Sequence, residues 1–264
     1  MRKGFMKVLV LTVLFTFSIG VIAYAFTAGY GSFAELSASE DPADYAIKAN
    51  DIGSDTTILA IHGGGIERGT SELVESLDGY GKYNTYLFKG LKTVDNGSLF
   101  LKAIHFDEPT AVNLVQKSDW TVSVIGAAGD DKVTYIGGQN KLLAELIRLH
   151  LVTKGYNVQT LSIPDRIAGT MNSNIANKNK LFHDSIQFGG VQIAVSKGLR
   201  DDLATYPCAL GDYSNTINKA LSESWPKIVK VLNKVNKSDT DKVLEKGAKD
   251  PQELIEDVEE EAKE

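Results

Sequence analysis

Residues 57–70 constrain the fold most, because they join the pattern of a buried strand to a glycine-rich bend. The apolar stretch that begins at Thr57 ends at His62, three glycines follow, and Glu67 opens the next segment. An imidazole nitrogen and a carboxylate oxygen are natural zinc ligands, and glycine lets the backbone turn sharply beside a bound group. The run therefore favours a metal site at the end of a strand. The alternative is a plain turn between a strand and a helix, with a solvated histidine and a glutamate that supports the helix N-terminus.

Strand-like and helix-like runs alternate along the chain from residue 55, which predicts an α/β fold with a single open mixed sheet flanked by helices. The expected strands are residues 57–62, 84–88, 99–105, 120–126, 132–136, 157–161 and 190–196. The clearest expected helix covers residues 140–154, where leucines recur on one broad face and Gly155 supplies the stop. Further helices are expected to begin near Thr70 and at Pro109.

Two of the expected strands end at a histidine, His62 and His105, and each is followed by a turn or a helix. In open α/β sheets, ligands bind outside the carboxyl ends of the strands. We therefore expect the two imidazoles to face one cleft.

The N-terminal residues 1–25 have the pattern of a secretory signal peptide, with a basic start, an apolar stretch and Ala23-Tyr24-Ala25 as a cleavage site. An uncleaved membrane anchor is the alternative, because the apolar stretch approaches the roughly 20 residues that span a bilayer. Either way, we expect the folded part to be secreted or otherwise extracytoplasmic, with no membrane contact after cleavage. Residues 26–43 are expected to form a linker, residues 44–235 an α/β domain, and residues 236–264 an acidic helical tail.

The cysteine count and the charge limit the disulfide bonds that the chain can form and the partners that it can bind. Cys208 is the only cysteine, so no intramolecular disulfide can form. The net charge is -6, and residues 237–264 alone carry eleven acidic and five basic residues, so nucleic acid is not an expected partner.

Several runs together resemble the poly-γ-glutamate hydrolase family, the phage-type depolymerases of polyglutamate, which share a zinc-carboxypeptidase-like α/β fold. The matching runs are residues 60–67 with Thr70, 86–90, 105–109, 135–140, 174–177 and 190–200. They occur in the order of the family and cover residues 44–203. The resemblance implies a zinc-dependent hydrolase of γ-glutamyl amide bonds, and the signal-peptide pattern makes a secreted one the expectation.

The resemblance implies a zinc ion held by His62, Glu67 and a third histidine, with a separate glutamate as general base. Such a site would activate a bound water and polarise the scissile carbonyl. This chain departs from the family pattern at both remaining positions, because Ile125 stands at the third ligand position and Ala194 at the general-base position. His105 is the candidate replacement ligand.

Acidic residues near these positions are candidates for a replacement base, with helix capping or solubility as the alternative role. They are Asp107, Glu108, Asp130 and Asp131.

Amide donors and fixed cations suit the carboxylates of an anionic polymer such as poly-γ-glutamate. The candidate polymer-binding residues are Asn140, Asn174, Asn177 and Arg200, with Lys89 as a further cation. For the asparagines, turn chemistry is the alternative. Two hypotheses follow: a hydrolase with a non-standard zinc site, or a catalytically inactive binding or structural module on the same fold.

Overall fold

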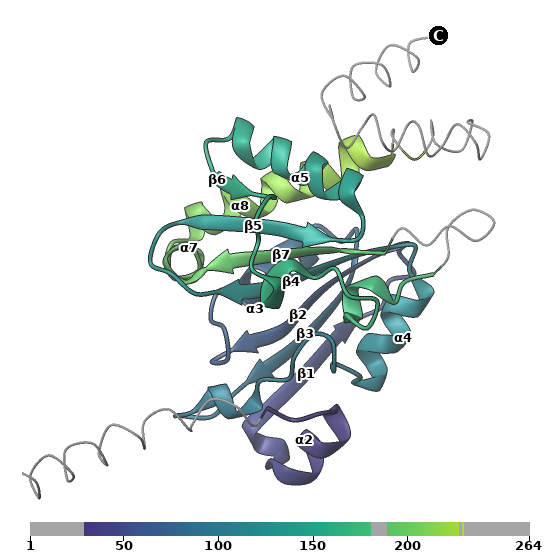
Figure 1. The fold of residues 1–264 in the computed structure, drawn as a ribbon, viewed down its shortest axis with the longest axis vertical. Coiled ribbons are helices and arrows are strands. Elements are labelled where there is room, and N and C mark those ends of the chain that lie inside the picture. The colour runs from purple at the N-terminus through teal and green to yellow at the C-terminus, as the bar shows by residue number, and fades with distance from the viewer. Residues whose placement is uncertain (1–28, 181–188, 227–228, 230–264) are drawn as a thin grey trace, which may run out of the picture.

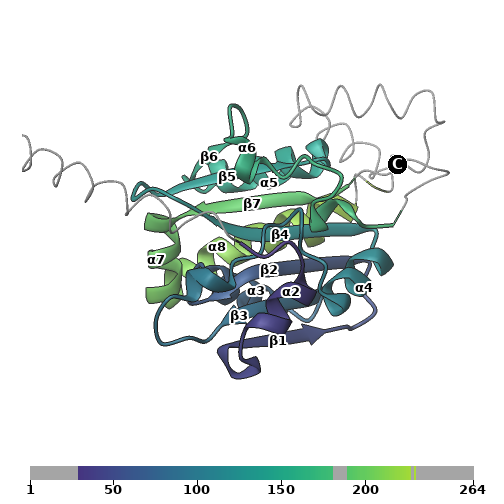
Figure 2. The same cartoon turned by 60° about the horizontal axis from the view of Figure 1, so that its bottom comes forward.

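The computed structural model describes residues 29–180, 189–226 and 229, and these form one seven-stranded mixed sheet with helices on both faces. The strand order is β1-β3-β2-β4-β7-β5-β6, which can be followed from bottom to top in Figure 2. Strands β3, β2, β4 and β7 run parallel, whereas β1 is antiparallel to β3 and β5 is antiparallel to β7. The predicted fold class, a single open mixed sheet flanked by helices, is confirmed.

The central strands are buried on both faces, as expected for parallel strands covered by helices. All eight residues of β4 and all six of β7 are buried, whereas β1 and β6 at the edges are half exposed. The strands are β1 (Tyr45–Asn50), β2 (Thr56–Gly64), β3 (Asn84–Gly90), β4 (Trp120–Ala127), β5 (Val133–Gly138), β6 (Asn157–Gln159) and β7 (Val191–Ser196).

Helices cover the two faces unequally and produce two apolar clusters (Figures 1 and 2). One face packs under α3 (Thr70–Asp78), α5 (Lys141–Thr153), α7 (Lys197–Thr205), α8 (Pro207–Lys219) and the π-helical turn Ala220–Ser224. The other face packs under α2 (Phe33–Ser39), α4 (Pro109–Lys117), α6 (Asp165–Ala168) and the 3-10 turns Asn96–Leu99 and Ile175–Asn177, and a further 3-10 turn, Pro42–Asp44, precedes β1. No helix among the described residues is long and apolar enough to cross a membrane.

One predicted strand is wrong, and one strand was missed. The predicted strand 99–105 is instead the last residue of the 3-10 turn Asn96–Leu99 followed by irregular chain, because β3 already has β1 on one side and β2 on the other. The strand that takes the edge position, β1, has a weak apolar alternation, which explains why the sequence did not indicate it. The other six predicted strands and the helices at Thr70, Pro109 and residues 140–154 are confirmed.

The segment expected to be a linker, residues 26–43, belongs to the folded domain from residue 29 onward. Helix α2 buries Leu36 completely in the apolar cluster beside β3, and the backbone N–H of Phe33 donates to Asp107 (2.6 Å). The segment was predicted to be a linker because its composition is mostly small and polar, and a short helix with one buried leucine changes that composition little. The predicted signal peptide and the acidic tail lie outside the described residues.

Candidate functional site

The glycine-rich bend after β2 folds Glu67 back onto His62. Gly64 has φ +62°, and a Cβ there would lie 2.4 Å from the carbonyl oxygen of Gly90. The N–H of Glu67 donates to the His62 carbonyl (2.8 Å), and the Thr70 hydroxyl donates to the carbonyls of His62 (3.2 Å) and Glu67 (2.9 Å). The glycines therefore permit a tight return of the chain, which backbone hydrogen bonds then fix.

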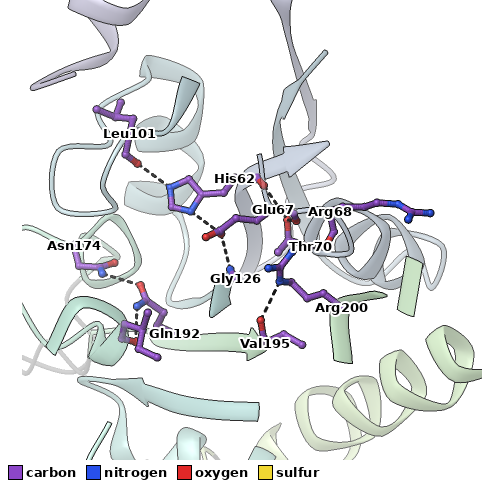
Figure 3. A network of polar contacts seen from close by, with 11 residues as sticks. His62, Glu67, Arg68, Thr70, Leu101, Gly126, Asn174, Gln192, Val195 and Arg200 are labelled. Carbon is purple, nitrogen blue, oxygen red and sulfur yellow. Dashed lines mark hydrogen bonds and ion pairs between the residues drawn. The ribbon is translucent and has the colours of Figure 1, made fainter. Parts of the chain in front are cut away.

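His62 is 2 % exposed, and both of its ring nitrogens have oxygen partners (Figure 3). Nδ1 lies 2.9 Å from Glu67 Oε2, and Nε2 donates to the Leu101 carbonyl at 2.8 Å. The ring stacks on Phe100, with the centroids 4.2 Å apart. A carbonyl fixing the far nitrogen of an imidazole is the usual support of a metal-ligating histidine.

Glu67 reaches from the bend to β4. Its Oε2 accepts from the N–H of Gly126 at 2.5 Å, beyond Ala60 and Val124, the last partners of β2 and β4 (Figure 3). A Cβ on Gly126 would lie 2.7 Å from the carboxyl carbon of Glu67 and 2.9 Å from Arg200 Nε. Gly126 therefore lets both side chains approach the strand.

Ile125 and Ala194, the positions at which the resemblance implies the third ligand and the base, are register partners on adjacent parallel strands. Tyr135 on β5 is the next partner in the same row. Ile125 is 4 % exposed and Ala194 is fully buried, both in the apolar cluster that also contains Ile167 from α6. This half of the site is hydrocarbon with a tyrosine beside it.

His105 does not lie at a strand end, contrary to expectation. It is an exposed residue in the turn that the hydrogen bond from its N–H to Lys102 closes. Across the described residues, no three His, Cys, Asp or Glu side chains gather closely enough to hold a metal ion. His62 and Glu67 have the geometry of two ligands, but a catalytic zinc uses three protein ligands and an open position, so the donor set does not fit that metal.

The replacement acids take structural roles or stay at the surface. Glu108 caps α4, because its Oε2 accepts from the N–H of Ala111 at 2.9 Å. Asp107 accepts a hydrogen bond from the backbone N–H of Phe33, and Asp130 and Asp131 are exposed. Burial, with Glu108 beside it, raises the pKa of the Tyr86 hydroxyl far above its usual range.

Of the four predicted polymer-binding residues, only Arg200 lies beside Glu67 (Figure 3). Its Nε donates to the Val195 carbonyl (3.0 Å) and its Nη1 to the Arg68 carbonyl (2.7 Å), and Arg68 is exposed. Lys89 is half-buried and pairs with Glu75.

The three asparagines bind backbone and side-chain groups at or near the opposite edge of the sheet, where β4 and β7 begin. Asn140 caps α5 through Leu143, and Asn174 donates to Gln192. Asn177 donates to the carbonyls of Gly169 and Met171 and accepts from the N–H of Gly190. The structure thus brings none of them to His62.

The groups that sequence reasoning missed are mostly backbone atoms: the carbonyl of Leu101 and the N–H of Gly126. No side-chain pattern announces such atoms. Phe100 carried a weak signal as an aromatic residue between two leucines, but its contact with His62 depends on the irregular path of the chain.

Comparison with known proteins gives a consistent set of matches. A family model described as poly-gamma-glutamate hydrolase matches residues 30–218. The SPbeta prophage-derived UPF0714 protein YoqZ of Bacillus subtilis (strain 168) is 42% identical over 150 residues, which cover 57% of this chain and 54% of YoqZ. UPF0714 protein YndL of the same organism is 37% identical over 174 residues, 66% of each chain. The chain therefore spans about half to two thirds of the length of these relatives.

Two solved structures share the fold. One, described as YNDL-apo (Zinc-free), has a TM-score of 0.67 and 32% identity and covers 74% of this chain and 98% of its own. The other, a bacteriophage poly-gamma-glutamate hydrolase, also has a TM-score of 0.67, with 29% identity over 75% of this chain and 98% of its own.

Proposed function

We propose, because the chain belongs to the poly-γ-glutamate hydrolase family, that it is a member that binds an anionic glutamate polymer without cleaving it. The proposal includes a location outside the cytoplasm, for which the sequence of residues 1–25 is the support.

The pairing of Ile125 with Ala194 carries the proposal. Hydrolysis of an amide needs a polarised carbonyl and a group that accepts the proton of the attacking water. Isoleucine has no lone pair, and alanine accepts no proton, so neither position supplies these functions. Both side chains lie inside an apolar cluster, where a water molecule would find no polar partner from them.

The arginines near Glu67 support polymer binding. Arg68 is exposed, and Arg200 is half-buried with its guanidinium held beside β4. A polymer with one carboxylate per residue presents repeated partners for guanidinium groups, whose planar fork suits carboxylates. Such binding weakens as salt screens the charges.

The test compares the wild type with a restored site. The full chain and the double variant Ile125→His plus Ala194→Glu are assayed for bound zinc and for fragments released from poly-γ-glutamate. We expect no fragments from the wild type, and zinc binding with hydrolysis from the double variant. Ile125→Val plus Ala194→Ser changes the same positions without adding a ligand or a base, and it serves as the control. Zinc-dependent release of fragments by the wild type would overturn the proposal.

Retention of the polymer is measured separately, with fluorescently labelled poly-γ-glutamate and a neutral polymer of similar length. Binding of the acidic polymer that decreases with salt supports the proposal, and equal retention of both polymers contradicts it.

A residual hydrolase is the second candidate, and the ligand-like geometry of His62 and Glu67 favours it. Its third zinc ligand would have to come from outside the residues that the structure describes. Hydrolysis by the wild type that is lost in Glu67→Gln would decide in its favour.

A further inference from the structure

We infer that His62 and Glu67 act in this chain as a structural clamp, which ties the bend after β2 to β4 and to residues 100–101. The inference rests on the proposed function, in which the pair has no metal to hold. It assigns the pair a role in stability in place of a role in ligation.

Both ring nitrogens of His62 have hydrogen-bond partners inside the protein. The Leu101 carbonyl and the Glu67 carboxylate both accept, so a ring with a proton on each nitrogen donates to Leu101 from Nε2 and to Glu67 from Nδ1, and one face of the ring stacks on Phe100. A buried imidazole with two good partners is a strong local constraint, because losing either partner leaves a desolvated polar atom. His62 is the buried centre of these contacts.

Glu67 takes the place of a strand partner for Gly126 on β4. The pairing of β2 with β4 extends only to Ala60 and Val124, and on its other side β2 shifts register against β3 between Ala60 and Gly63. Beyond that point, Glu67 Oε2 accepts from the N–H of Gly126. Buried backbone N–H groups need an acceptor, so the carboxylate continues the hydrogen bonding that β2 no longer supplies.

The contacts of His62 and Glu67 join segments that are far apart in the chain. Leu101 lies 39 residues after His62, and Gly126 lies 59 residues after Glu67. Arg200 adds a further connection, because its Nη1 donates to the Arg68 carbonyl and its Nε to Val195 at the end of β7 (Figure 3). A few side chains thus fix the loops at the carboxyl ends of three parallel strands.

A double-mutant cycle of the full chain tests the clamp, with His62→Ala, Glu67→Gln and the combination measured by urea unfolding in the presence of a chelator. We expect each single change to raise the unfolding equilibrium constant by about 10- to 100-fold, which is about 1.4–2.8 kcal/mol. The double change should cost clearly less than the sum, because the two residues contact one another. His105→Ala and Asp130→Asn, at exposed positions, are the matched controls and should change the constant by less than about threefold.

Added zinc separates the clamp from ligation. We expect zinc to leave the melting temperature of the wild type unchanged. A rise in melting temperature that disappears in Glu67→Gln would overturn the inference, and so would single variants as stable as the controls. Strictly additive effects would also contradict a direct connection between the two residues.

Hydrogen exchange of the wild type keeps the inference testable if a variant does not fold. The amide of Gly126 should exchange as slowly as that of Val124 in the same strand, with or without chelator. Fast exchange at Gly126 would contradict the clamp. Failure of the proposed function would show as fragments in the hydrolysis assay, which is independent of all these stability measurements.

Discussion

The two ends of the parallel strands use polar side chains in opposite ways. At the carboxyl edge, where β2, β4 and β7 end, His62 and Glu67 meet beside the exposed Arg68. At the amino edge, where β4 and β7 begin, Asn140 and Asn177 are almost fully buried and bind the backbone of their own surroundings. The carboxyl edge carries charges near the surface, whereas the amino edge carries buried amides.

This difference shows why a polar residue in a family motif is weak evidence of contact with substrate. Asn177 lies in one of the matching runs, yet its side chain holds Gly169, Met171 and Gly190 in place. A motif can persist because a turn needs it as readily as because a ligand does. Variants at the two edges should therefore differ in kind: loss of stability at the amino edge, and loss of binding at the surface of the carboxyl edge.

The largest effect is expected at the amino edge, from Asn177→Ala. The change leaves two carbonyls and the N–H of Gly190 without this partner, at a side chain that is 2 % exposed. We expect a loss of about 3–5 kcal/mol in the free energy of unfolding, because each buried polar group left unsatisfied costs about 1–3 kcal/mol. Urea unfolding measures it, with Asn172→Ala, an exposed asparagine nearby, as the control. Weaker polymer binding by folded Asn177→Ala would erase the distinction between the edges.

The next effect is expected from Ile125→Ala in the hydrocarbon half of the site. Removing a buried isoleucine side chain from the apolar cluster should cost about 2–4 kcal/mol, and Ile125→Val about 0.5–1.5 kcal/mol. Thermal unfolding without metal measures both. An unchanged stability of Ile125→Ala would mean that position 125 is open to solvent, and the apolar filling of the site would then be wrong.

Most of the fold could be predicted from the sequence because its strands are long, buried and bounded by turn residues. The apolar run that begins at Thr57 is typical of a buried strand, and Gly155 follows a helix whose leucines occupy one face. The strand at residues 99–105 was mispredicted because local pattern does not reveal that β3 already has two neighbours. Which strands lie on the outside of a sheet depends on the order of all its strands, and no single segment of sequence contains that order.

The site could be predicted only in part for a related reason. His62 and Glu67 are five residues apart across a glycine bend, so the local sequence offered a metal site there, with a plain turn as the alternative. The position of His105 depended on a strand that does not form, and the partners of His62 and Glu67 at Leu101 and Gly126 are backbone atoms. Local chemistry was therefore predictable, whereas chemistry contributed by distant backbone was not.

A smaller effect is expected for polymer binding at the carboxyl edge, from Arg68→Lys at the exposed arginine beside Glu67. Lysine keeps the charge but loses the planar fork, so affinity for poly-γ-glutamate should fall about 3- to 10-fold, or about 0.7–1.4 kcal/mol. Binding titrations at low salt measure it, and Arg166→Lys on the exposed surface of α6 is the control. Equal losses in the two variants would show that only net charge matters, and the carboxyl edge would then have no special role.

The smallest effect concerns a charged network beside the end of β3, which should make the carboxyl edge sensitive to alkaline pH. Tyr30 donates to Glu40 (2.7 Å), and Lys92 pairs with the same carboxylate. Burial and the neighbouring Glu40 raise the pKa of Tyr30 from 10.0 to about 12, and Glu40 raises the pKa of Lys92.

A raised pKa means that the folded protein holds the proton more tightly than the unfolded chain does, so this stabilisation is complete below pH 10 and is lost as the pH rises from 10 toward 12. Tyr30→Phe removes the contribution of Tyr30 to this loss of stability. Tyr83, whose pKa burial also raises to about 12, contributes equally in the wild type and in the variant. Urea midpoints at pH 8, 10 and 11.5 should therefore fall less steeply for Tyr30→Phe than for the wild type. The amide contacts of Asn177 contain no group that titrates in this range, so hydrogen exchange should report loosening at residues 30–44 before residues 174–177. Simultaneous loosening of both segments would mean that the two edges unfold as one unit, and the contrast between them would then not extend to their stability.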